Sequence, residues 1–137
     1  MELMAQLDIA LNATYLPSEE AILIHVGNNT DKTMRIYNSY GASSGSLIQF
    51  HLKDKTGNEI SLYEAVFYEG VDYQKIVYIN PSSTKTFRFL LKHLCPSNRS
   101  TADIYSVDAS CFIDYSIPEK EKYEFIHKVL PIKTKQD

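Results

Sequence analysis

Apolar and polar residues alternate with a period of two along most of this chain. In one segment, Ile22, Ile24 and Val26 alternate with Leu23 and His25. Alternation of this kind is typical of a β-strand that rests one face on a core. The same pattern gives the other residues that we expect to face inward: Leu7, Ile9 and Leu11; Met34 and Ile36; Ile48, Phe50 and Leu52; Ile60 and Leu62; Phe87, Phe89 and Leu91; and Tyr105, Val107, Ala109, Cys111, Ile113 and Tyr115.

Clusters of Gly, Pro, Asn, Asp and Ser separate these segments. Such residues ease chain reversal, and Gly57 suits a backbone with positive φ in a hairpin. Short strands separated by regular turns predict an all-β fold, an antiparallel immunoglobulin-like β-sandwich of seven or eight strands. The whole chain, 1–137, is expected to form this single domain. The clusters are 16–20, 28–32, 41–45, 54–58, 80–83, 95–100 and 118–122.

The order of the late strands determines what the two cysteines can do. Residues 85–92 and 104–116 are expected to pair as a hairpin centred near Asn98, which places Cys95 and Cys111 roughly 25–30 Å apart at the usual strand rise. A disulfide needs a Cα separation of about 5–6 Å, so we expect Cys111 to be a buried thiol and Cys95 a loop thiol.

Residues 118–133 fit two structures. Pro118 with apolar residues at helical spacing is compatible with a helix, whereas alternation after a short polar turn favours a final strand. We favour the strand.

Composition and charge exclude several function classes. The formal net charge of the 137 residues is −3, and the basic residues form no run, which argues against nucleic-acid binding. No stretch approaches 18 apolar residues, so no transmembrane helix is predicted. The first residues lack the basic start and apolar block of a signal peptide. The sequence as given therefore predicts a cytoplasmic protein, or a periplasmic or secreted one if a leader has been removed.

Residues that commonly carry catalysis are dispersed. His25, His51, His93 and His127 lie in separate segments, and the chain has no H-E-x-x-H, C-x-x-C, P-loop, G-x-G-x-x-G or G-x-S-x-G motif. Asp108 and Asp114 share one strand face but lie roughly 20 Å apart at strand rise, too far for a glycosidase pair. We predict no enzymatic activity, no metal site and no cofactor.

Three N-glycosylation sequons begin at Asn12, Asn28 and Asn98. The sequon at Asn28 lies in the polar run 28–32, between two stretches whose apolar residues are expected to face inward. We therefore interpret this run as a chain reversal between core strands and the sequon as incidental.

The segment 62–78 is the most unusual in composition, because it combines four Tyr with three acidic residues. Tyr provides a large contact area at low entropic cost, so tyrosine-rich loops are common at recognition surfaces. Tyr63, Phe67 and Tyr78 are expected to belong to the core or to cap it. The residues predicted to be exposed and to bind a protein partner are Tyr68, Glu69, Asp72 and Tyr73.

Four stretches in order carry a family resemblance: "ILIHVGNNTDKTMRIYN", "IQFHLKDKTGNEISLY", "VYINPSSTKTFRFLL" and "ADIYSVDA". Over residues 20–110 this order resembles the N-terminal β-sandwich domain of deuterolysin-type metallopeptidases, including the peptidyl-Lys endopeptidases. Bacterial intracellular proteinase inhibitors are similar in their immunoglobulin-like sandwich. The resemblance implies a sandwich with a binding or inhibitory role. Because the peptidase domain and its H-E-x-x-H helix are absent, it implies no peptidase activity.

The sequence therefore predicts a non-catalytic protein-binding module. Its most concrete form is a small bacterial inhibitor or immunity-type protein that blocks a partner enzyme or toxin. The partner is then another protein, such as a peptidase or a toxin, with no nucleic acid or membrane involved, and the chain is a monomer or a weak homodimer. The alternative is a structural or assembly domain of a surface or secretion apparatus.

Overall fold

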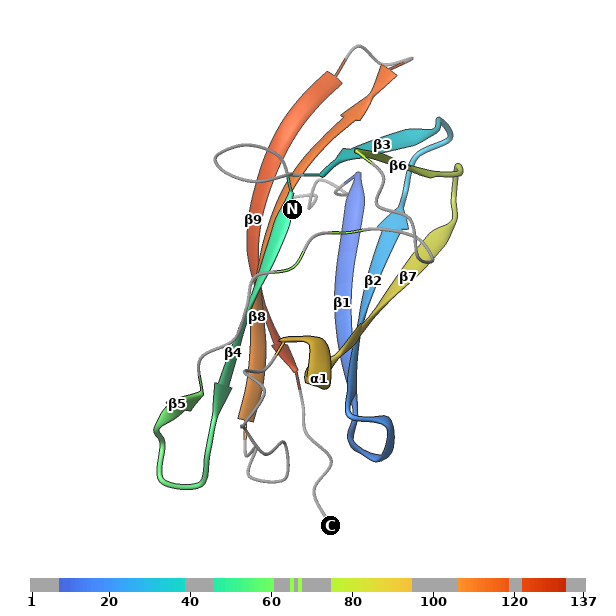
Figure 1. The fold of residues 1–137 in the computed structure, drawn as a ribbon. Helices are drawn as coiled ribbons and strands as arrows, with labels where there is room; N and C mark the ends of the chain where they lie inside the picture. Colours follow the sequence, from blue (N-terminus) through green and yellow to red (C-terminus); the bar gives the residue numbers. More distant parts are fainter. Residues whose placement is uncertain are drawn as a thin grey trace, which may run out of the picture.

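The computed structural model describes residues 8–38, 46–60, 65, 67, 75–94, 106–118 and 122–132; for 122–132 it describes the backbone. Strands dominate these residues and form two antiparallel sheets that face each other (Figure 1). This confirms the predicted all-β sandwich.

The smaller sheet has the order β1-β2-β7, formed by β1 (Ile9–Leu16), β2 (Ala21–Asn28) and β7 (Thr84–Leu90). A 3-10 turn, Pro17–Glu19, joins β1 to β2, and its Pro has the fixed φ that suits the first position of such a turn. A short helix, α1 (Leu91–Leu94), follows β7 directly.

The larger sheet is built around one long strand, β8 (Ser106–Ile117). Along one side, β8 pairs first with β4 (Leu47–Lys53) and then with β3 (Met34–Tyr37). Along the other side it pairs with β9 (Lys122–Ile132). The short strands β5 (Glu59–Ile60) and β6 (Ile76–Ile79) extend the sheet beyond β4 and β3.

The predicted inward faces are confirmed wherever the structure describes them. Alternate residues of β2, β3, β4, β7 and β8 enter one core cluster. Two aromatic pairs fill it between the sheets: Phe50 with Phe89, at a ring separation of 5.5 Å, and Phe67 with Phe87, at 4.9 Å. The first pair is tilted and the second is edge-on, a favourable aromatic geometry. The core is therefore shared by both sheets.

Three local predictions are also confirmed. The final segment is the strand β9 rather than a helix. Gly57 has a φ of +87° in the hairpin between β4 and β5. Cys111 is a thiol on the inward face of β8, with no exposed surface. Cys95 lies outside the described residues.

The predicted hairpin between residues 85–92 and 104–116 is wrong. β7 pairs with β2 in the smaller sheet, whereas β8 pairs with β3, β4 and β9 in the larger one. The chain leaves the smaller sheet through α1 and returns in the other sheet. Alternation showed which side of each strand faces the core, and it carried no information on which sheet the strand joins.

The polar run 28–32 connects two buried strands, as predicted, but these strands lie in different sheets. Asn28 is 1% exposed at the end of β2. Its Nδ2 donates hydrogen bonds to the carbonyl oxygens of Lys32, Ile79 and Asn80, at 2.7, 3.0 and 3.2 Å. Its Oδ1 accepts from the N–H and the hydroxyl of Thr30, at 3.0 and 2.7 Å.

This network joins two crossings between the sheets. One crossing is the run from β2 to β3, and the other is the turn from β6 to β7. The backbone adds two bonds between them, from the N–H of Asn28 to Ser83 O and from the N–H of Ser82 to Thr30 O. Hydrogen bonds to both the nitrogen and the oxygen of this buried amide stabilise the fold and leave neither polar atom unsatisfied. We call this arrangement the Asn28 corner.

Candidate functional site

The strongest candidate for a functional site surrounds Asn38, the residue that follows β3. The side chain of Asn38 makes two hydrogen bonds with the backbone of Phe67: its Nδ2 donates to Phe67 O, and its Oδ1 accepts from the Phe67 N–H at 3.1 Å. The backbone N–H of Asn38 donates to Lys75 O at 2.8 Å. Asn38 therefore holds both ends of the segment 68–74.

A second segment starts from the same residue. Asn38 forms a parallel β-bridge with Ser46, and the N–H of Ser46 donates to Tyr37 O at 2.6 Å. The Ser46 hydroxyl, fully buried, accepts from the N–H of Asp114 in β8 at 2.8 Å and donates to the carbonyl of the same residue at 3.3 Å. Both ends of the segment 39–45 are thus tied to the framework of the larger sheet.

The side chain of Phe67 secures this region to the core. Phe67 has no exposed surface and packs edge-on against Phe87. Two residues earlier, Ala65 exchanges both backbone hydrogen bonds with Ile48 of β4, at 2.7 and 3.0 Å. The chain between β5 and β6 is therefore fixed to the edge of the larger sheet at these points. We call Asn38, Ser46, Phe67 and Lys75 the Asn38 junction.

The predictions for segment 62–78 have different outcomes. Phe67 is confirmed as a core residue. Tyr78 is 50% exposed, so its prediction as a core or cap residue is wrong: it lies on the outward side of β6, opposite Arg35. Tyr63 and the four predicted binding residues, Tyr68, Glu69, Asp72 and Tyr73, lie outside the described residues.

Aromatic and charged side chains lie beside the junction on the outer face of the larger sheet. Tyr37 is partly exposed, and its hydroxyl forms a hydrogen bond of 2.7 Å with the hydroxyl of Ser116. In the register of β3 and β6, Arg35 lies opposite Tyr78, and Tyr37 lies opposite Ile76. Tyr and Arg are enriched in protein interfaces because they combine contact area with polar groups.

No sequence pattern indicates that Asn38 matters. It follows a strand and precedes a polar run, as many asparagines do. Its partners are Phe67 and Lys75, far along the chain, so only the strand pairing brings them together. The one available signal was Phe67, the single Phe in a segment rich in Tyr and acidic residues.

His25 and His51 lie on the outward faces of β2 and β4, as the alternation predicted, and each bonds to hydroxyl groups. His25 lies between Thr14 and Thr86, with nitrogen–oxygen distances of 3.1 and 2.9 Å. His51 lies 3.1 Å from the hydroxyl of Ser110. Within the described ranges, no group of three His, Cys, Asp or Glu is placed to hold a metal ion.

The structure shows that two of the three sequons differ in whether their asparagine is accessible to a glycan. Asn28 uses its Nδ2 in three hydrogen bonds and is buried, so a glycan attached to this atom is incompatible with the folded chain. Asn12 is exposed on β1. Asn98 lies outside the described residues.

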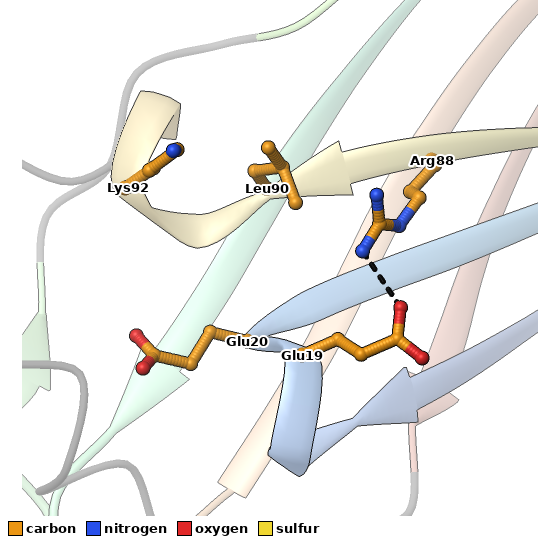
Figure 2. A pocket seen from close by; sticks show the side chains of 5 residues that line it. All are labelled: Glu19, Glu20, Arg88, Leu90 and Lys92. Carbon is orange, nitrogen blue, oxygen red and sulfur yellow. Dashed lines mark hydrogen bonds and ion pairs between the residues drawn. The ribbon is translucent and has the colours of Figure 1, made fainter.

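A shallow depression of about 340 Å³ lies at the far end of the smaller sheet (Figure 2). The β1–β2 turn contributes Glu19 and Glu20, and the end of β7 with α1 contributes Arg88, Leu90 and Lys92. Arg88 and Glu19 form an ion pair of 2.6 Å with both side chains half-exposed. Exposed ion pairs of this kind contribute little to the stability of the fold. The depression is therefore of interest as a surface that a partner could contact.

Comparison with protein-family models gives no match for this chain, and comparison with curated protein sequences gives none either. The resemblance to the deuterolysin N-terminal domain stays a prediction. Of the helices in the described part of the chain, none has the length and apolar character needed to cross a membrane.

Proposed function

We propose that this chain is a non-catalytic protein-binding module that presents the segments 39–45 and 68–74 from the Asn38 junction to a protein partner. Its most concrete form is a small bacterial inhibitor or immunity-type protein that blocks a partner enzyme or toxin. The observation that carries this proposal is that one residue, Asn38, holds an end of the first segment and both ends of the second.

The physical argument concerns the cost of ordering a loop on binding. A loop whose ends are already fixed on a packed sheet loses less conformational entropy when a partner binds it. Binding residues are therefore commonly found on loops that a rigid scaffold positions. The segment 68–74 contains all four predicted binding residues, with two Tyr and two acidic side chains.

The surface beside the junction supports the same role. Tyr37, Tyr78 and Arg35 lie on the adjoining outer face of β3 and β6. A partner that contacts the two segments would also meet these residues. They are the residue types that most often anchor protein interfaces.

The test starts with capture of the partner from native lysate, using the whole chain as bait, and identification by mass spectrometry. The purified partner is then titrated with four forms of the chain: wild type, a variant with Tyr68, Glu69, Asp72 and Tyr73 changed to Ala, Asn38→Ala, and Asn58→Ala. Asn58 is an exposed asparagine of the β4–β5 hairpin and serves as the matched control.

We expect the fourfold variant to bind at least about a hundredfold more weakly, because the loss of interface anchors costs about 2 kcal/mol or more each. Asn38→Ala should bind more weakly as well, because the base of the segment is loosened, and Asn58→Ala should bind as wild type does. Equal affinity of the fourfold variant and wild type would remove the segment from the interface and contradict the proposal.

A further inference from the structure

Among the described residues, β7 is the longest edge strand whose outer edge lies against no other element. The opposite edge strand of the smaller sheet, β1, lies against β9. In the larger sheet, β5 and β6 have only two and four residues, and Tyr78 O in β6 accepts a hydrogen bond from Lys85 Nζ. The seven residues of β7 pair on one side only, with β2.

The register shows which backbone groups of β7 face this edge. The N–H of Asn28 donates to Ser83 O at 2.8 Å, and the N–H of Leu91 donates to Glu20 O at 2.9 Å. Hydrogen-bonded pairs recur at every second residue in an antiparallel ladder. The N–H and C=O groups that point away from β2 therefore belong to Thr84, Thr86, Arg88 and Leu90.

The side chains along this edge have one sign of charge. Residues 84–94 contain Lys85, Arg88 and Lys92 and no carboxylate, although the chain as a whole carries a net charge of −3. At the end of β7, Arg88, Leu90 and Lys92 form one side of the depression, and Glu19 and Glu20 form the other (Figure 2). A strand that paired with the outer edge of β7 would lie next to Arg88, Leu90 and Lys92.

We propose that the β7 edge binds an extended acidic segment of a partner protein by strand addition. The backbone groups of Thr84, Thr86 and Arg88 and the N–H of Leu90 supply the hydrogen bonds, and alternate side chains of the added strand lie over the outer face. On this outer face Arg88, with Lys92 just beyond the end of the strand, favours acidic side chains. Lys85 lies on the opposite face of β7, where its Nζ donates to Tyr78 O. This inference rests on the proposed function only in that both require a protein partner, since it concerns a different surface.

The positive charge of β7 also favours an acidic segment over a second copy of this chain as the added strand. Two β7 strands paired antiparallel would bring the outer-face Arg88 of both copies into one ladder of seven residues. Like charges on directly neighbouring strands are destabilising. Bare edge strands that carry Lys are in general protected from self-association for this reason.

The test uses the whole chain, labelled with ¹⁵N, and two blocked eight-residue peptides: one alternates valine with glutamate, and the other alternates valine with lysine. The acidic peptide should shift the amide signals of Thr84, Thr86, Arg88 and Leu90 and slow their hydrogen exchange. The basic peptide should leave these signals unchanged.

Two variants separate the backbone contribution from the loss of the side chain. Thr86→Pro removes an edge N–H without removing a bond to β2 and should weaken acidic-peptide binding at least tenfold. Thr86→Ala loses the same hydroxyl and the same contact with His25, yet it should bind as wild type does. Arg88→Glu should reduce the preference for the acidic peptide.

Several results would overturn the inference: no amide shift along β7 with the acidic peptide, equal binding of both peptides, or equal weakening by Thr86→Pro and Thr86→Ala. Concentration-dependent dimerisation through β7 would replace the proposed occupant with a second copy. Failure at β7 leaves binding through the Asn38 junction intact, and the titrations with the fourfold variant test that junction separately.

Discussion

Two asparagines flank strand β3, and the fold uses them in opposite ways. Asn28 is buried and directs both its amide atoms to backbone and hydroxyl groups of the two sheet crossings. Asn38 is partly buried and directs its amide to the backbone of Phe67. The same type of side chain thus joins two crossings of the framework before β3 and holds the residue that precedes segment 68–74 after it.

The difference concerns what each network holds in place. The Asn28 corner joins residues that all belong to the framework, so its loss is expected to weaken the whole fold. The Asn38 junction joins β3 to Ser46, Phe67 and Lys75, the residues that bound the two segments, so its loss is expected to act locally. Stability measurements and local exchange measurements separate these two effects.

The largest effect should come from the apolar anchor of the junction. Phe67→Ala removes a fully buried ring that packs on Phe87 and should lower the free energy of unfolding by about 3–5 kcal/mol. Urea denaturation followed by circular dichroism measures this change. Tyr78→Ala, at a half-exposed position nearby, should cost less than about 1 kcal/mol. Similar losses for both variants would show that Phe67 is not a core residue.

The next largest effect should come from the corner. Asn28→Ala removes the hydrogen bonds of the buried amide to three carbonyl oxygens and to the N–H and hydroxyl of Thr30, and should cost about 2–4 kcal/mol in urea denaturation. Asn28→Asp keeps the shape but turns a carboxylate oxygen toward those carbonyls, so it should be at least as destabilising. The exposed Asn12→Ala should change stability by less than about 0.5 kcal/mol. A neutral Asn28→Ala would contradict the structural role of the corner.

Among the three core and junction variants, the smallest loss of stability should come from Asn38→Ala, at about 1–2 kcal/mol, because its amide is partly buried and bonds the backbone of a single residue. Hydrogen exchange should show the local character of the change: the Phe67 N–H should exchange faster, while the N–H groups of Ile22 and Ile24 in β2 keep their protection. Uniform acceleration across both sheets would mean that Asn38 belongs to the framework in the same sense as Asn28.

The sequence predicted the inward faces because alternation is a local property of each strand. Ile22, Ile24 and Val26 lie in the core as their spacing required. Strand partners are not local: β7 and β8 follow one another along the chain and still belong to different sheets. A hairpin was the simpler expectation, since neighbouring strands often pair.

The hydrogen bonds of the two asparagines divide in the same way, into bonds to residues near in the sequence and bonds to distant residues. Turn chemistry correctly indicated that Asn28 bonds its own chain, through Thr30 and Lys32. Its bonds to Ile79 and Asn80, and those of Asn38 to Phe67, join residues distant in sequence. Such contacts exist only once the sheets have formed, so no local pattern announces them.

The long strand β8 has a consequence for synthesis of the chain. The smaller sheet needs no residue beyond Leu90, so its three strands are all available once that residue has emerged from the ribosome. β4 and β3, although made early, lack their main partner until residues 106–117 appear. Pairings that span so much chain form slowly, and unpaired strands expose apolar surface while they wait. The nascent protein therefore passes through a stage in which one sheet is complete and half of the other has no partner.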